Sequence, residues 1–186
     1  MNKNRHTIRL KNYDYSQNGL YFVTICTENR ECLLGDIVDG KMILNECGEI
    51  VNDVLNSLPD RYKQIELDLY QIMPNHIHMI IIIHPVVGAI HESPLHESPL
   101  PKSPNRRFIK RGDQRELLPQ CIGYFKMNSS KQINQFVRAH HDAPQQQKIF
   151  QRNYYEHVIR NENELNKIRE YIRINPQIWD RDRNNI

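Results

Sequence analysis

The sequence lacks the features that mark a membrane or secreted protein. Its longest uninterrupted apolar run, Met79 to Ile83, is far shorter than the roughly 20 residues that a membrane-spanning helix needs. The N-terminal stretch MNKNRHTIRLKNYDY contains no apolar segment of the kind that secretory signals carry. The four cysteines show no CxxC pairing, which is typical of reduced thiols that mostly fill the core. We therefore expect a cytoplasmic protein.

There is also no strong excess of charge of either sign. The chain has 25 Lys and Arg residues against 22 Asp and Glu, and its formal charge is +3 with its 9 histidines neutral. This mildly basic balance permits a nucleic-acid partner without establishing one. With 186 residues, of which 25% are charged and 39% hydrophobic, the chain fits one soluble globular domain, 1–186, with room for an insertion.

The most informative stretch runs from Met73 to His84, MPNHIHMIIIIH. Its Pro-Asn pair predicts a turn, and the apolar run that follows predicts a strand. Side chains of a strand alternate between its two faces. His76, His78, Ile80 and Ile82 should therefore face one way, and Ile77, Met79, Ile81 and Ile83 the other. A strand that is apolar on both faces is central, or covered on both sides.

Two imidazoles side by side on one face of a strand supply half of a metal site. The alternative is that His76 and His78 are two partly buried histidines whose nitrogens bond to neighbouring groups. On the His-x-His motif alone, both interpretations stay open.

The remaining pattern predicts a mixed α+β chain. Strands are expected at 20–27, 41–44 and 65–69, with a hairpin turn at Asp39-Gly40. Helices are expected at about 46–58, capped by Asn45, at 119–139, and from a capping box at Asn161 to about residue 174. These elements favour a ferredoxin-like or RRM-like palm, with a central antiparallel sheet and helices on one face.

The segment 85–112 differs in composition from the rest. It contains the duplicated pentapeptide HESPL at 91–95 and 96–100, followed by further proline. We interpret it as a flexible insertion, because it offers little to bury. Its basic end, from Lys102 to Arg111, suits either a phosphate-contacting segment or a charged linker.

Tyr171 and Asn175 stand four residues apart near the end of the last predicted helix. Taken alone, Tyr171 is an ordinary boundary aromatic. Together with the histidine pair it could act as a nucleophile in phosphoryl transfer, if a divalent ion made the phosphate electrophilic. Since two histidines are too few ligands, Asn175 could add a third.

Three blocks of the chain carry a resemblance to a known family. They are IRLKNYDYSQNGLYFVTICTENR at 8–30, MPNHIHMIIII at 73–83 and QRNYYEHVIRNENELNKIREYIRINPQIW at 151–179. In this order they resemble the single-tyrosine HUH transposases, and more closely the REP-associated tyrosine transposase branch. The resemblance implies the HUH endonuclease fold, with Tyr171 as catalytic residue and His76, His78 and Asn175 as ligands of Mg²⁺ or Mn²⁺. No small-molecule cofactor is implied.

The implied activity is cleavage and rejoining of single-stranded DNA at REP-type hairpins through a 5′-phosphotyrosine. A monomer is favoured, a dimer remains open, and the implied location is nucleoid-associated. The rival interpretations are a non-catalytic single-stranded nucleic-acid-binding module and a metal-dependent hydrolase in which Tyr171 is passive. By charge alone, six residues are candidate DNA contacts: Arg5, Arg9, Lys126, Arg152, Arg160 and Lys167.

Overall fold

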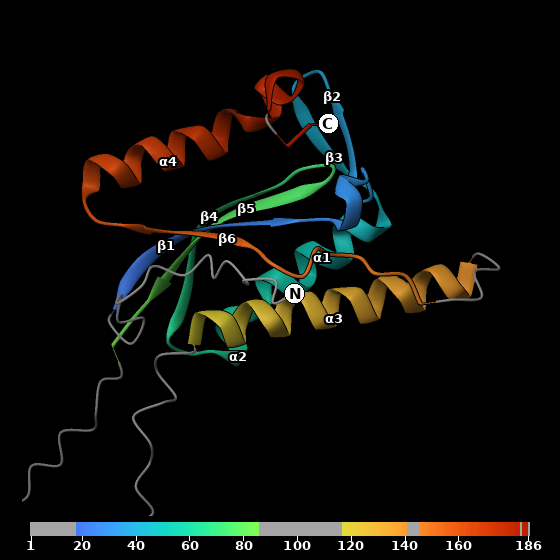
Figure 1. The fold of residues 1–186 in the computed structure, drawn as a ribbon, viewed down its shortest axis with the longest axis horizontal. Helices are drawn as coiled ribbons and strands as arrows, with labels where there is room; N and C mark the ends of the chain where they lie inside the picture. Colours follow the sequence, from blue (N-terminus) through green and yellow to red (C-terminus); the bar gives the residue numbers. More distant parts are fainter. Residues whose placement is uncertain (1–17, 86–116, 141–145, 183, 186) are drawn as a thin grey trace, which may run out of the picture.

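The fold is built on one antiparallel sheet (Figure 1). The computed structural model describes residues 18–85, 117–140, 146–182 and 184–185. Arg5 and Arg9 lie outside them, as does the expected insertion at 85–112 apart from Pro85. The sheet has the strand order β4-β5-β1-β6. Its strands are β1 (Gly19–Cys26), β4 (Ile65–Ile72), β5 (His76–Ile83) and β6 (Tyr155–Ile159).

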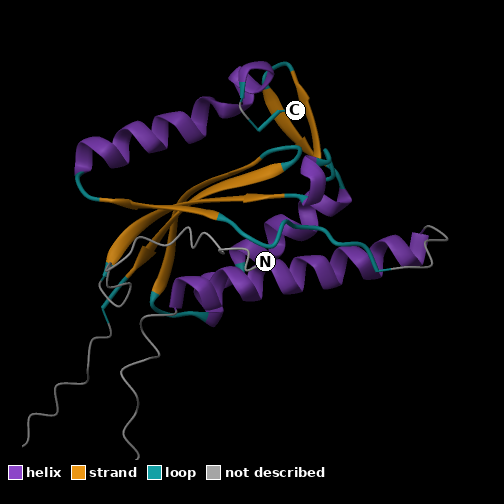
Figure 2. Ribbon diagram, viewed as in Figure 1, coloured by secondary structure: helices purple, strands orange, loops and turns teal. Residues whose placement is uncertain are grey.

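A second, two-stranded ribbon and the helices surround this sheet (Figure 2). The ribbon pairs β2 (Gly35–Val38) with β3 (Lys41–Leu44) through the predicted Asp39-Gly40 turn. The helices are α1 (Glu46–Asn56), α2 (Leu58–Arg61), α3 (Leu117–His140) and α4 (Glu162–Ile174). Short 3₁₀ segments are η1 (Glu28–Arg30) and η3 (Asn175–Arg181). In the part of the chain that is described, no helix has the length and apolar character to cross a membrane.

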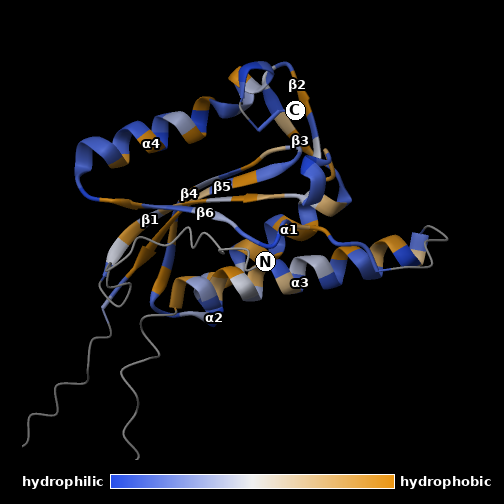
Figure 3. Cartoon of the chain, viewed as in Figure 1, coloured by the Kyte–Doolittle hydropathy of each residue, from blue (hydrophilic) through white to orange (hydrophobic). Residues whose placement is uncertain are grey.

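The α+β class and the central antiparallel sheet are confirmed, but the helices lie on both faces of the sheet rather than on one. Helices α1 and α3 cover one face and α4 the other (Figure 1). The physical reason is that β1 and β5 are apolar on both faces, so that each face needs its own cover. Figure 3 shows the apolar segments of these strands between the helix layers.

The predicted alternation of β5 is confirmed, because its two sets of side chains belong to two separate apolar clusters. Ile77, Met79, Ile81 and Ile83 join the large core beneath α1 and α3. Ile80 joins a smaller cluster beneath α4, with Phe22, Ile159, Leu165 and Ile172. The histidines therefore lie on the α4 side of a central strand.

The boundaries of the other elements follow local chemistry. The predicted caps are confirmed: the Oδ1 atoms of Asn45 and Asn161 accept the amide hydrogens of Gly48 and Glu164, each at 2.9 Å. The sequence does not predict strand β6, because most of its five residues are polar. In the structure its first three residues are exposed or half-buried.

Strand β4 departs from the simple alternation expected at 65–69. Leu67 pairs with Ile81 and Leu69 with Ile80, so that Asp68 is an extra residue, a β-bulge. As a result, both Asp68 and Leu69 face α4: Leu69 packs in the cluster beneath that helix, and Asp68 bonds to Arg169. The sequence pattern could not show this, because a bulge is defined by the partner strand.

Candidate metal and nucleophile site

The two histidines of β5 meet at their Nε2 atoms. Both side chains are fully buried, and their Nε2 atoms lie 3.0 Å apart. His76 Nδ1 lies 2.8 Å from Oδ1 of Asn75, an acceptor, so this nitrogen carries a hydrogen and Nε2 is the ring nitrogen turned toward His78. His78 Nδ1 lies 2.8 Å from Oγ1 of Thr24 on β1. Such outer partners orient metal-binding imidazoles, and two ring nitrogens this close can share a proton or a cation between them.

Asp182, just beyond η3, completes the cluster. The ligand atoms of His76, His78 and Asp182 all lie within 4.8 Å of one another, and Asp182 is 7% exposed. Burial raises the pKa of the Asp182 carboxyl, but hydrogen bonds from the Asn184 N–H and the Asn175 amide, with the nearby histidines, outweigh it. The pKa of Asp182 therefore lies below its ordinary value, and the carboxylate is ionised at neutral pH.

Asn175 lies inside the same cluster, directly after α4. It is fully buried, and its Nδ2 donates to Asp182 Oδ2. Its Oδ1 is buried with no hydrogen-bond partner among the described residues. An unsatisfied buried amide oxygen calls for an explanation, and a cation is one. Two imidazole nitrogens, a carboxylate and an amide oxygen form a donor set that suits a divalent ion such as Mn²⁺, while the identity of the metal is not defined by the set.

Tyr171 brings a hydroxyl to this cluster. The oxygen lies 3.2 Å from His78 Nε2 and 3.5 Å from Asp182 Oδ2. Its ring is half-buried and packs edge-on against Phe22 at 6.3 Å between centroids. The structure thus brings together Tyr171, His76, His78 and Asn175, the four residues singled out in the sequence.

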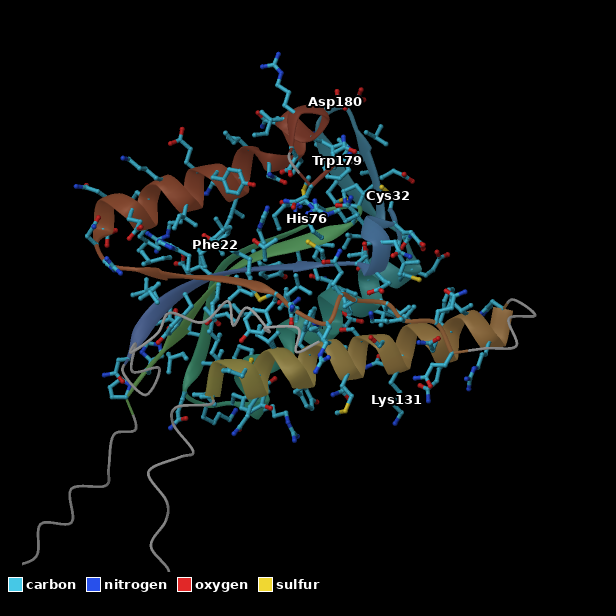
Figure 4. The ribbon with its side chains drawn as sticks, viewed as in Figure 1. Phe22, Cys32, His76, Lys131, Trp179 and Asp180 are labelled. Carbon is cyan, nitrogen blue, oxygen red and sulfur yellow. The ribbon has the colours of Figure 1, made fainter. Side chains whose placement is uncertain are left out.

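Aromatic side chains cover both imidazoles, and Figure 4 labels Trp179, Phe22 and His76. Trp179 of η3 stacks on His76 at 6.0 Å and Phe22 of β1 stacks on His78 at 5.3 Å, measured between ring centroids. They shield the histidines from water, which strengthens the interaction of the cluster with any charge bound there.

A strained turn holds the end of the chain against the site. Asn29 and Arg30 both have left-handed backbone angles, φ of 52° and 57°. Asparagine tolerates this region, whereas in Arg30 it costs about 1–3 kcal/mol. Asn75 Nδ2 donates to the carbonyls of Arg30 and Asn184, and Arg30 donates to Asn184 Oδ1 at 3.0 Å. This network places the segment that carries Asp182.

Asp182 was missed in the sequence because it follows the α4 pattern in a short polar run, DRDRNN, with no periodicity. The acidic residue Asp180 of the same run is exposed. Only the turn of η3 distinguishes the two, and the spacing gives no sign of it.

The candidate DNA contacts are dispersed. Lys126 lies on α3, across the sheet from α4, and its ammonium donates to the carbonyls of Gln151 and Arg152. Burial and the neighbouring Lys148 lower its pKa. Arg152, Arg160 and Lys167 are exposed, and Lys167 lies one helical turn from Tyr171. The structure therefore brings Lys167, but not Lys126, near the cluster.

The fold and the sequence each have a relative among known proteins. The structure of a REP-associated tyrosine transposase bound to a REP hairpin matches with a TM-score of 0.53, over 91% of this chain and 72% of that one, at 16% identity. No family model matches the chain. An uncharacterized protein of Haemophilus influenzae is 35% identical over 178 residues, 96% of this chain and 91% of its own length. The chain has the fold of the REP-associated transposase structure, and it belongs to the same family as the Haemophilus protein.

Proposed function

We propose that the protein is a transposase-like, metal-dependent endonuclease and strand transferase that acts on single-stranded DNA through Tyr171. The observation that carries the proposal is the position of the Tyr171 hydroxyl, 3.2 Å from His78 Nε2 within the His76, His78 and Asp182 group. A buried acceptor cluster next to a tyrosine hydroxyl suits an activated oxygen nucleophile.

In the proposed reaction, the Tyr171 oxygen attacks the phosphorus of a phosphodiester. The bond from phosphorus to the 3′-oxygen breaks, which leaves a 5′-phosphotyrosine and a free 3′-hydroxyl. The tyrosine proton passes to the Asp182 carboxylate, whose Oδ2 lies 3.5 Å from the hydroxyl, and the departing 3′-oxygen takes up a proton from water. Because the phosphotyrosine conserves the energy of the broken bond, a 3′-hydroxyl can reverse the step, and no nucleotide cofactor is needed.

The metal would be held by His76, His78 and Asp182, with the unsatisfied Oδ1 of Asn175 as a further ligand. Bound there, Mg²⁺ or Mn²⁺ supplies positive charge that polarises the phosphate and stabilises the transition state. The chain itself orients the ligands, through Asn75 and Thr24, and covers them with aromatic rings.

The proposed substrate is a DNA hairpin of the REP type. The structural relative is bound to a REP hairpin. The exposed side chains of Lys167, Arg160 and Arg152 are candidates for contacts to phosphates. Arg5 and Arg9 remain candidates by charge.

We propose a monomer, because α4 already packs on the sheet of its own chain.

A denaturing gel tests the proposal directly. The protein is mixed with single-stranded hairpin oligonucleotides from the repeats that flank its gene, with Mn²⁺, Mg²⁺ or a chelator. A protein-linked DNA band that requires metal and disappears in Tyr171→Phe is expected. Tyr124→Phe, on α3 across the sheet, is the matched control and keeps the band. Cleavage without a linked band would instead indicate a hydrolase.

One observation favours a second function, a non-catalytic binding module. Tyr155 on β6 is 44% exposed and packs against Phe22 on the α4 side of the sheet. Exposed aromatics on a sheet stack with bases of single strands. Metal-independent hairpin binding without any linked band, unchanged in Tyr171→Phe but weakened in Tyr155→Ala, would support this alternative.

A further inference from the structure

One half-buried ion pair joins the tyrosine helix to the edge of the sheet. Arg169 of α4 donates from Nε to Oδ2 of Asp68 at 2.8 Å, and from Nη2 to Oδ1 at 2.6 Å. The side chains are 27% and 15% exposed. Among the described ion pairs it is the one in which an arginine holds both oxygens of a carboxylate, a geometry that is directional as well as strong.

The β-bulge of β4 makes this pair possible. Because Asp68 is the extra residue, it and Leu69 both face α4, one with its carboxylate and the other with its apolar side chain. Bulges commonly redirect a side chain next to a functional site. Here the bulge lets one strand edge supply an apolar contact and an ionic contact to the same helix.

The apolar contacts of α4 with the sheet come from one stripe of the helix. Leu165, Ile168 and Ile172 form the stripe that meets the sheet. Hydrophobic contact is not directional, so a stripe of three side chains opposes rotation of the helix less strictly than a bond of fixed geometry does. On a helix, Arg169 and Tyr171 project from opposite flanks of the stripe, toward β4 and toward the histidines respectively. Holding Arg169 against β4 therefore also holds Tyr171 beside the histidines.

We propose that the Asp68–Arg169 pair is a positioning device that sets the rotation of α4, and so holds the Tyr171 hydroxyl at the metal cluster. The inference rests on the proposed function, because it assigns the pair a role in that reaction. A second set of contacts supports the arginine: Asn166 Oδ1 accepts from Nη1 at 3.3 Å, and Glu162 lies 3.7 Å from it. The guanidinium is thus held from its own helix while it bonds to the sheet.

The test uses Asp68→Asn, Arg169→Lys and the charge swap Asp68→Arg with Arg169→Asp. Arg169→Lys keeps the positive charge but loses the bidentate hydrogen bonds to the two carboxylate oxygens of Asp68. We expect the single-turnover rate of the linked band to fall about 10- to 100-fold at saturating DNA, while the Kd for the hairpin stays within about twofold, because phosphate contacts supply most binding. The swap should recover most of the rate. Lys63→Gln, which removes a 3.5 Å ion pair to Asp60 away from α4, is the control and keeps the wild-type rate.

Hydrogen exchange separates this inference from the proposed function. In Arg169→Lys, the amides of α4 should exchange faster while those of β5 and α3 are unchanged, and the swap should reverse the effect, whether or not the protein cleaves DNA. If the wild-type protein forms no linked band, the proposed function fails. The exchange result alone then tests whether the Asp68–Arg169 pair positions α4. Unchanged exchange in α4, a single-variant rate equal to wild type, or a swap as slow as the slower single variant would overturn the inference.

Discussion

At the scale of single residues, the proposed metal site depends on the carboxylate of Asp182, which the helical sequence pattern does not predict. Asp182 is the carboxylate of the described cluster, whose other members are two imidazoles and an amide. Its ionised form is stabilised by the hydrogen bonds from Asn184 and Asn175. A divalent cation gains most from that charge, because it is attracted strongly where water is excluded.

Asp182→Asn should therefore weaken metal binding while leaving the fold intact. The substituted amide has nearly the same shape but lacks the charge. We expect a loss of at least about 10-fold in Mn²⁺ affinity, measured by calorimetric titration, since even the outer partners of metal ligands contribute that much. Asp180→Asn is the matched control: Asp180 is exposed, belongs to the same segment and is not a member of the cluster. A titration of Asp182→Asn that coincides with the wild type would remove Asp182 from the ligand set.

At the scale of elements, much of what was expected from the sequence is local. The faces of β5 and the two asparagine caps follow from spacing within one segment, and they are confirmed. The bulge at Asp68, strand β6 and the place of Asp182 depend on partners far along the chain, which spacing does not contain. The sequence does contain the reason for helices on both faces, since β5 is apolar on both sides.

Two helical glycines make a matched test of how closely the elements fit. A Cβ on Gly48 of α1 would lie 2.1 Å from the carbonyl oxygen of Leu34, whereas a Cβ on Gly123 of α3 would meet nothing within 4 Å. Alanine usually gains about 0.5–1 kcal/mol over glycine in a helix, and Gly123→Ala should show this gain in chemical denaturation. For Gly48→Ala, overpacking costs about 1–3 kcal/mol and exceeds the gain.

The effect of Gly48→Ala should also reach the site. Leu34 donates its amide hydrogen to the carbonyl of Pro74, which lies at the turn into β5. Moving Leu34 therefore disturbs the strand that carries His76. A Gly48→Ala protein as stable as wild type would show that α1 can shift away from Leu34 without cost.

At the scale of the whole molecule, the sheet separates the layer that holds the large apolar core from the layer that holds the proposed site. The large cluster lies between the sheet and the helices α1 and α3. The small cluster and the residues of the site lie between the sheet and α4. Because β5 contributes to both, neighbouring residues of one strand should affect different properties.

Ile80 and Ile81 test this division, since both are fully buried and chemically identical. Ile81 pairs with Tyr21 and Leu67 over the large core, whereas Ile80 pairs with Phe22 and Leu69 beneath α4. Truncating a buried isoleucine costs about 2–5 kcal/mol, and the cost depends on how far the surroundings can collapse into the cavity. We expect Ile81→Ala to have the lower Tm, because its neighbours are fixed on all sides.

The order should reverse for the reaction. Ile80→Ala leaves a cavity under the helix that carries Tyr171, and α4 can move into it, so that the hydroxyl leaves its position beside His78. The rate of the protein-linked band, measured well below both melting temperatures, should therefore fall in Ile80→Ala and stay near the wild-type rate in Ile81→Ala. If both rates fell in proportion to the loss of stability, the two layers would be one cooperative unit, and the position of α4 would depend on the whole core rather than on its own contacts with the sheet.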